Sequence, residues 1–268
     1  GTNVFNGDQP LETVLNRIAE VKAWDQPLFF VTFSHHFNNF LAAIIGNAGV
    51  VLKCSDPDTP ARIGAEQLES TAQQAIELTE KIRAEMASRY GDDVVVEFCM
   101  RYGNPSIVSA LDELRSAGVE RLLVLPLYPQ YSATTTASIF DAVSDELQRW
   151  RWLPELRFIN HYHDDPAYID ALADSVRDFQ AEHGVPDRLM LSFHGIPREY
   201  FLAGDPYFCE CQKTGRLLAE ALKLPEDRWQ LTFQSRLGPK AWLKPYTDMT
   251  LTSLAKAGTK NVQVICPG

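Results

Sequence analysis

The sequence predicts an α/β fold of parallel sheets with flanking helices, preceded by an N-terminal helical hairpin. A chain of 268 residues with 45% apolar and 22% charged residues is typical of one or two folded domains. Apolar residues recur every three or four positions in the first part, whereas apolar runs alternate with helical patterns in the rest. We expect the hairpin over residues 1–90, a first α/β domain over 91–165 and a second over 166–268.

Two apolar stripes define the expected hairpin. The first begins at Phe33 and continues through Phe37 and Phe40 to Ala48, and a Pro- and Asp-rich turn at 54–60 ends it. The second stripe runs from Ile63 to Met86. A lone hairpin leaves both stripes exposed, so we expect it to pack on the rest of the chain or to form a homodimer.

The remainder alternates strands with helices. The expected strands are Val94–Cys99, Arg121–Leu127, Leu156–Asn160, Arg188–Phe193, Trp229–Phe233 and Val262–Cys266. The expected helices are Ser106–Ala117, Ala137–Trp150, Pro166–Glu182, Cys209–Leu222 and Thr247–Ala257. Ligands of such sheets bind beyond the carboxyl ends of the strands, so the residues that follow the strands are the candidates for binding and catalysis.

Composition excludes several classes of function. A net charge of −10 disfavours nucleic-acid binding. The longest apolar run, Phe40–Leu52, is too short and too interrupted to cross a membrane, and no secretory signal is visible. Five scattered cysteines do not form a disulfide framework, and Cys209 and Cys211 alone do not complete a metal site. We therefore expect a cytoplasmic protein without a transmembrane segment, with no required cofactor and no iron–sulfur cluster.

The residues that follow the strands are aromatic rings, hydroxyls, arginines and a histidine. They suit a flat, largely apolar ligand that bears carboxylates. His194 follows a buried strand, where a neutral imidazole can accept a proton or bind a metal. The alternative is a histidine that only stabilises its loop. His161 and His163 have the spacing of a metal pair, but without an evident third ligand we favour a loop role.

Four ordered blocks of sequence resemble the ferrochelatase family from about Asp92 to Gly268. They are the segment 190–197 (MLSFHGIP) followed by 204–207 (GDPY), the segment 125–132 (LPLYPQYS), the segments 233–236 (FQSR) and 242–248 (WLKPYTD), and the segment 100–105 (MRYGNP). The resemblance implies two similar α/β domains with porphyrin bound in the cleft between them. It also implies insertion of ferrous iron, as a substrate, into protoporphyrin IX in haem biosynthesis.

The resemblance also assigns roles to residues. The family's metal-site histidine falls on His194, which would take the pyrrole protons, bind the incoming metal, or both. The residues expected to bind the substrate are Arg101, Tyr102, Tyr128, Tyr131, Ser132 and Thr134.

Two family features have no counterpart in the sequence. The family begins with an apolar strand and a Gly-Thr-Pro loop, which nothing in residues 1–90 resembles. It also continues beyond Gly268 into a helix that carries an acidic metal-site residue. One alternative is therefore a core that binds porphyrin without metallating it.

Residues 33–48 are similar to the phosphoacceptor helix of sensor histidine kinases, and residues 60–81 are similar to the second helix of that hairpin. The resemblance places the phosphorylated histidine at His35, with His36 where the family has an acidic residue. The alternative function is a histidine phosphoacceptor or dimerisation module joined to a catalytically incomplete, porphyrin-binding core. A hairpin that only packs or dimerises is the simpler reading.

Overall fold

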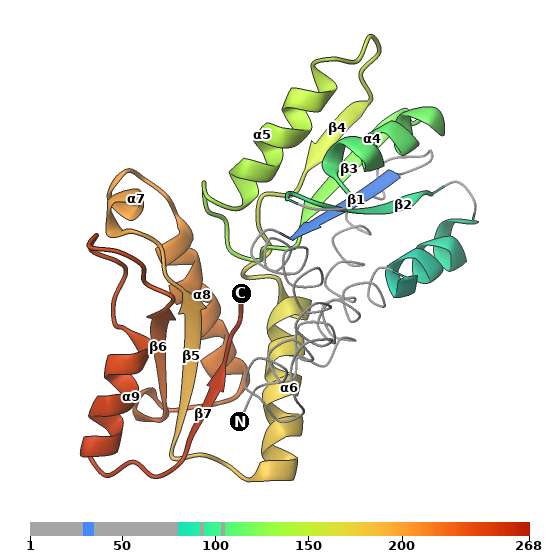
Figure 1. Ribbon diagram of the computed structural model, residues 1–268. Helices are drawn as coiled ribbons and strands as arrows, with labels where there is room; N and C mark the ends of the chain where they lie inside the picture. The colour runs from blue at the N-terminus through green and yellow to red at the C-terminus, as the bar shows by residue number, and fades with distance from the viewer. Residues whose placement is uncertain (1–28, 35–79, 92–93, 103–104) are drawn as a thin grey trace, which may run out of the picture. The chain divides into compact units, whose positions relative to one another are not determined.

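The computed structural model describes residues 29–34, 80–91, 94–102 and 105–268 (Figure 1). This described part divides into two compact units. The first unit contains the described residues up to Tyr128 and residues 133–161, and the second contains residues 129–132 and 162–268. The chain passes from the first unit to the second for the last time between His161 and Tyr162. We expected the domain boundary four residues later, between residues 165 and 166.

The described strands of the first unit form a parallel sheet in the order β2-β1-β3-β4. Their bounds are β1 Phe29–Ser34, β2 Val96–Met100, β3 Arg121–Pro126 and β4 Glu155–Phe158. The helices are α4 Ile107–Ser116 and α5 Thr136–Leu147, and residues 80–90 are also helical. The parallel α/β fold predicted from the sequence is thus confirmed in this unit.

Strand β1 corrects the prediction for the N-terminal part. We placed Phe33 at the start of a helical stripe, but Phe29–Ser34 pair in parallel with β2 on one side and β3 on the other (Figure 1). Residues 29–34 are therefore a strand of the first sheet and not the start of a helix. The remainder of the predicted hairpin up to residue 79, including His35, lies outside the described residues.

Local signals explain the helices of the first unit. Ser106 caps α4, because its hydroxyl accepts a hydrogen bond from the Ser109 amide at 3.0 Å, and Gly118 ends the turn that follows with a φ of +78°. In residues 80–90, Ile82 and Met86 are buried one turn apart, as the second apolar stripe predicts. From the same helix Arg83 donates to the Val96 carbonyl of β2.

The described strands of the second unit form a parallel sheet in the order β6-β5-β7. Its strands are β5 Arg188–His194, β6 Trp229–Gln234 and β7 Val262–Ile265. Its helices are α6 Pro166–His183, α7 Arg198–Leu202, α8 Tyr207–Ala221 and α9 Thr247–Lys256, with the short 3₁₀ helix η2 at Glu226–Arg228. The sequence did not indicate α7 or η2.

The faces of the second sheet differ in chemistry. Helix α8 packs on one face so closely that a Cβ at Gly215 would lie 3.1 Å from Leu231 and 3.5 Å from Leu191. The other face carries the hydroxyls of Ser192 and Thr232, both of which bond to Thr247 at 2.9 Å. Because side chains alternate along a strand, His194 at the end of β5 belongs to the hydroxyl-bearing face.

Thr247 begins α9, as it begins the helix predicted over Thr247–Ala257, and Tyr246 holds the cap position. The Thr247 hydroxyl forms hydrogen bonds with Ser192 and Thr232 of the sheet. Among the described residues, no helix combines the length and apolarity needed to cross a membrane.

Candidate functional site

His194 lies at the carboxyl end of β5, the middle strand of its sheet. It is in register with Gln234 of β6, and the amide of Gly195 donates to the Gln234 carbonyl at 2.7 Å. A Cβ at position 195 would lie 2.8 Å from that oxygen and 3.3 Å from the Trp242 ring. Glycine is therefore required for the close approach that fixes the end of the strand beside the imidazole.

The surroundings of His194 favour a neutral imidazole. Its Nδ1 lies 2.7 Å from the Gly195 carbonyl, and because a carbonyl only accepts, Nδ1 carries the proton and Nε2 the lone pair. Partial burial lowers the pKa of His194, and the hydrogen bond to Gly195 opposes this shift less strongly. A neutral imidazole has the chemistry of a base or of a metal ligand, which are the two roles that the sequence suggested.

The backbone of His194 is held by a chain of hydrogen bonds. The Tyr207 hydroxyl donates to the His194 carbonyl at 3.0 Å, and the Tyr207 amide donates to Asp205 Oδ1 at 3.0 Å. Asp205 Oδ2 accepts from the Ser132 hydroxyl at 2.9 Å. We expected Ser132 to line the substrate pocket, but its side chain is fully buried and faces Asp205.

Residues 129–132 are anchored on helix α8. The Tyr131 amide donates to Glu210 Oε2 at 2.6 Å, and the same oxygen lies 3.3 Å from His163 Nδ1. Gln130 Nε2 donates to Thr214 Oγ1 at 3.1 Å. The Tyr131 side chain is half-buried, which is compatible with its predicted contact with a substrate.

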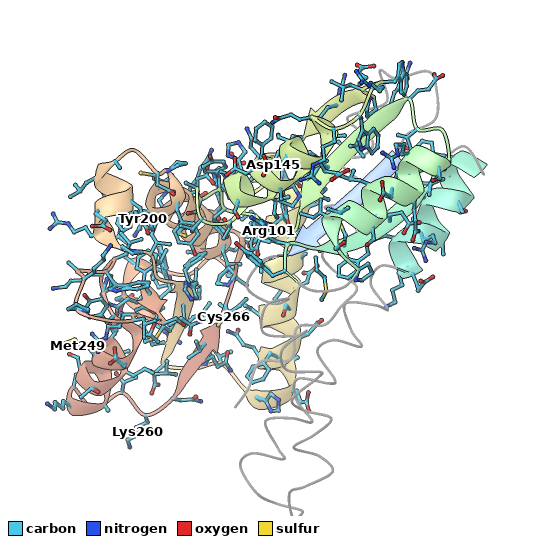
Figure 2. The ribbon with its side chains drawn as sticks, turned by 45° about the horizontal axis from the view of Figure 1, so that its top comes forward. Arg101, Asp145, Tyr200, Met249, Lys260 and Cys266 are labelled. Atoms are coloured by element: carbon cyan, nitrogen blue, oxygen red, sulfur yellow. The ribbon has the colours of Figure 1, made fainter. Side chains whose placement is uncertain are left out.

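Arg101, which Figure 2 labels, and the next residue, Tyr102, follow β2 at the carboxyl end of that strand. Arg101 Nε donates to the Ser138 carbonyl at 2.9 Å and to its hydroxyl at 3.1 Å, which ties the arginine to the first turns of α5. The guanidinium carbon lies 4.4 Å from the centre of the Tyr102 ring. Tyr102 is exposed, so this pair offers a cation and an aromatic face together.

Tyr128 and Thr134 follow β3 in the same unit. Tyr128 is half-buried and packs against the apolar core formed by α4, α5 and the sheet. Thr134 is half-buried in the turn that leads into α5. The predicted residues therefore fall into two groups: Arg101, Tyr102, Tyr128 and Thr134 in the first unit, and Tyr131, Ser132 and His194 in the second.

The paired cysteines of α8 point in different directions. Cys209 is exposed, whereas Cys211 is fully buried and burial raises the pKa of its thiol. Two residues apart on a helix, they do not present their sulfur atoms to one ion. Cys266 follows β7 and is half-buried, with its sulfur 3.9 Å from Gln234 Nε2 (Figure 2).

Three residues of this region received no role in the sequence analysis. Asp205 and Tyr207 lie within the GDPY segment that supported the family resemblance, but their part in holding His194 depends on contacts across the fold. Glu210 was overlooked between two cysteines that attracted attention as metal ligands. An acidic residue on the buried face of an otherwise apolar stripe was the available signal.

A cavity of about 320 Å³ lies elsewhere in the second unit, between β6 and α9. It is lined by Gln230, Lys244, Pro245, Tyr246, Met249, Thr250, Ser253 and Leu254. None of the residues predicted for the site belongs to this lining.

Comparisons with known proteins agree with the sequence blocks. The ferrochelatase family model matches residues 66–268. The match begins earlier than Asp92, where we placed the start of the resemblance. The ferrochelatase of Hydrogenovibrio crunogenus is 56% identical over 207 residues, covering 76% of this chain and 53% of the relative. That of Marinobacter nauticus is 56% identical over 205 residues, covering 76% and 54%. The chain thus spans about half the length of the curated relatives it matches.

One solved structure supports the fold. SirB from Bacillus subtilis, in a structure with Fe³⁺, superposes with a TM-score of 0.52 at 13% identity, covering 89% of this chain and 75% of SirB. At that identity the similarity concerns the fold alone.

Proposed function

The chain belongs to the ferrochelatase family, and from that premise we propose that its protein inserts ferrous iron into protoporphyrin IX in haem biosynthesis. In this reaction Fe²⁺ replaces two pyrrole protons, and both protons must leave the ring nitrogens. A base of near-neutral pKa that does not carry a charge beforehand serves this step. We assign that role to His194, which takes a pyrrole proton, binds the incoming iron, or does both.

The observation that carries the proposal is the state of the His194 ring. Its Nδ1 proton is engaged by the Gly195 carbonyl, and partial burial lowers its pKa. Nε2 then presents a lone pair at the carboxyl edge of the sheet. A lone pair at that position serves proton transfer and metal binding equally, so geometry alone leaves both roles open.

The other residues supply the chemistry expected for a porphyrin. Tyr102, Tyr128 and Tyr131 offer aromatic surface for a flat macrocycle, and the Arg101 guanidinium pairs with a carboxylate. Thr134 contributes a hydroxyl. Ser132 makes no direct contact with the porphyrin in this proposal, since its hydroxyl donates to Asp205.

Several expectations remain predictions. We propose that iron is a substrate and that no further cofactor or iron–sulfur cluster is required. A cytoplasmic location and a homodimer formed through residues 1–90 are likewise predictions.

The histidine-kinase alternative receives no support. The ferrochelatase match begins at residue 66, inside the segment that we compared with the second kinase helix. Strand β1 moreover includes Phe33, where we began the phosphoacceptor helix.

Metal insertion by the purified chain tests the proposal. Under anaerobic conditions the protein is mixed with protoporphyrin IX and Fe²⁺, or Zn²⁺ as a surrogate, and the porphyrin absorption spectrum is followed. We expect insertion in the wild type and in a His183→Ala control, which changes an exposed histidine at the end of α6, but not in His194→Ala. Equal rates in the wild type and His194→Ala would remove His194 from the reaction. Porphyrin binding without insertion by any variant would favour the non-metallating core.

A further inference from the structure

We propose that Ser132, Asp205 and Tyr207 form a hydrogen-bonded relay that positions His194. The inference rests on the role proposed for His194, because it concerns how that imidazole is held. It makes all three positioning residues rather than groups that touch a substrate.

The first link joins Tyr207 to the end of β5. The Tyr207 hydroxyl donates to the His194 carbonyl at 3.0 Å, at the point where the ladder ends. Tyr207 is buried, and because a carbonyl oxygen only accepts, the phenol hydroxyl that faces it is the donor. The peptide that leaves His194 is thus held from outside the sheet as well as by Gln234.

The second link fixes the position of Tyr207. Asp205 Oδ1 accepts from the Tyr207 amide at 3.0 Å, so the carboxylate ties down the first residue of α8. A carboxylate at a helix N-terminus is also favoured by the helix dipole. Asp205 therefore determines where α8 begins, and with it where the phenol ring stands.

The third link brings in a distant part of the chain. Ser132 donates to Asp205 Oδ2 at 2.9 Å, so each carboxylate oxygen has a separate donor. Ser132 has no exposed surface, and the adjacent Gln130 and Tyr131 are bonded to Thr214 and Glu210 of α8. The hydroxyl therefore cannot move away without breaking neighbouring contacts.

These links constrain the orientation of the imidazole. The His194 carbonyl and the Gly195 amide belong to one peptide plane, which is bonded at one end to Tyr207 and at the other to Gln234. The next carbonyl, of Gly195, selects the Nδ1 tautomer. If the plane rotates, that carbonyl moves, and Nε2 is no longer presented in one direction. Misplacement of a reacting group by about 1 Å can cost two orders of magnitude in rate.

Two variants break the relay at its ends, and a third is a matched control. Tyr207→Phe removes the bond to His194, and Ser132→Ala removes the bond to Asp205. Tyr168→Phe makes the same chemical change at another buried tyrosine of the second unit, whose hydroxyl donates to the Pro267 carbonyl. All three lose a side-chain hydrogen bond, but only the first two belong to the relay. Tyr168→Phe also removes the 3.4 Å contact of Gln130 Nε2, so it controls for a disturbance of residues 129–132 outside the relay.

The decisive readout is the His194 tautomer, measured by ¹⁵N NMR of the imidazole in the full chain without metal or porphyrin and assigned with His194→Ala. We expect one Nδ1–H tautomer in the wild type and in Tyr168→Phe. We expect a mixture in Tyr207→Phe and a smaller change in the same direction in Ser132→Ala. This measurement does not need chelatase activity, so it stands even where metal insertion fails.

Steady-state zinc insertion supplies the second readout. We expect Tyr207→Phe to lower kcat about three- to tenfold, as the loss of one hydrogen bond predicts, with KM for porphyrin unchanged. A Tyr207→Phe protein with the wild-type tautomer and the kcat of Tyr168→Phe would overturn the relay. A tautomer change in Tyr207→Phe but none in Ser132→Ala would overturn the part assigned to Ser132.

Discussion

The two sheets of this molecule carry polar chemistry in different places. In the first unit, residues 122–126 of β3 are apolar and buried, and the polar candidates Arg101 and Tyr128 come after their strands. In the second unit, the buried hydroxyls of Ser192 and Thr232 lie within the strands themselves, on the face that ends in His194. The polar candidates of the first unit thus lie on loops, whereas the second unit also buries hydroxyls within its strands, on the face to which His194 belongs.

Gly195→Ala should have the largest effect of the substitutions that test the difference between the two sheets. The new Cβ would lie 2.8 Å from the Gln234 carbonyl, so β5 and β6 must separate at their ends, at a cost of about 1–3 kcal/mol. Hydrogen–deuterium exchange should rise in β5 and β6 and remain unchanged in β2 and β3, which serve as the internal control. Exchange that rises equally in both sheets would mean that the effect is not local.

Two substitutions that exchange a methyl group and a hydroxyl in opposite directions, one in each sheet, test the difference directly. Val124→Thr places a hydroxyl in the apolar interior of β3, and Thr232→Val removes one from the bonded set in the second unit. We expect each to destabilise its own unit by about 1–2 kcal/mol, because one buries an unpaired hydroxyl and the other removes a partner. Chemical denaturation combined with exchange measures both, and a stabilising Thr232→Val would show that the hydroxyl set is dispensable.

Arg101→Met tests whether the contacts of a loop arginine contribute to the stability of the first unit. It removes the bonds from Nε to Ser138 and the stacking on Tyr102, and we expect a loss of about 0.5–1.5 kcal/mol confined to this unit. The control is Arg151→Met, an exposed arginine of the same unit, which should change stability by less than about 0.5 kcal/mol. Equal effects would indicate that Arg101 is not held by its helix contacts.

The smallest predicted effect is a pH dependence confined to the second unit. Because the pKa of folded His194 lies below its unfolded value of about 6.5, the unfolded chain binds more protons once the pH falls below that value. Stability is therefore full above pH 6.5 and decreases as the pH falls toward the folded pKa. Denaturation at pH 7.5 and 5.5 should show a smaller loss in His194→Gln than in the wild type. An identical loss would assign the acid sensitivity to other groups.

Local sequence signals predicted most of the elements but not all. Strands β3, β5, β6 and β7 were found within about one residue of their ends, since buried strands in this class are short apolar runs. β1 was missed because Phe33, Phe37 and Phe40 have helical spacing. The strand is determined by pairing with β2 and β3, which begin far along the chain.

The site was predictable to a similar degree. The sequence placed His194 at the end of a buried strand, as the structure does, and its role in the reaction stays a prediction. The burial of Ser132 was not, because it depends on a carboxylate 73 residues away. Residue type indicated a hydroxyl suited to a substrate, whereas the fold uses that hydroxyl as a donor to Asp205.

Residues 129–132 belong to the second unit although the segments on both sides belong to the first, and this affects the order in which contacts form during translation. The partners of Gln130, Tyr131 and Ser132 lie 84, 79 and 73 residues downstream. At about 5–20 residues per second, the ribosome adds these partners roughly 4–17 s after the segment itself. The nascent chain therefore carries Gln130, Tyr131 and Ser132 without these partners until residues 205–214 have been synthesised.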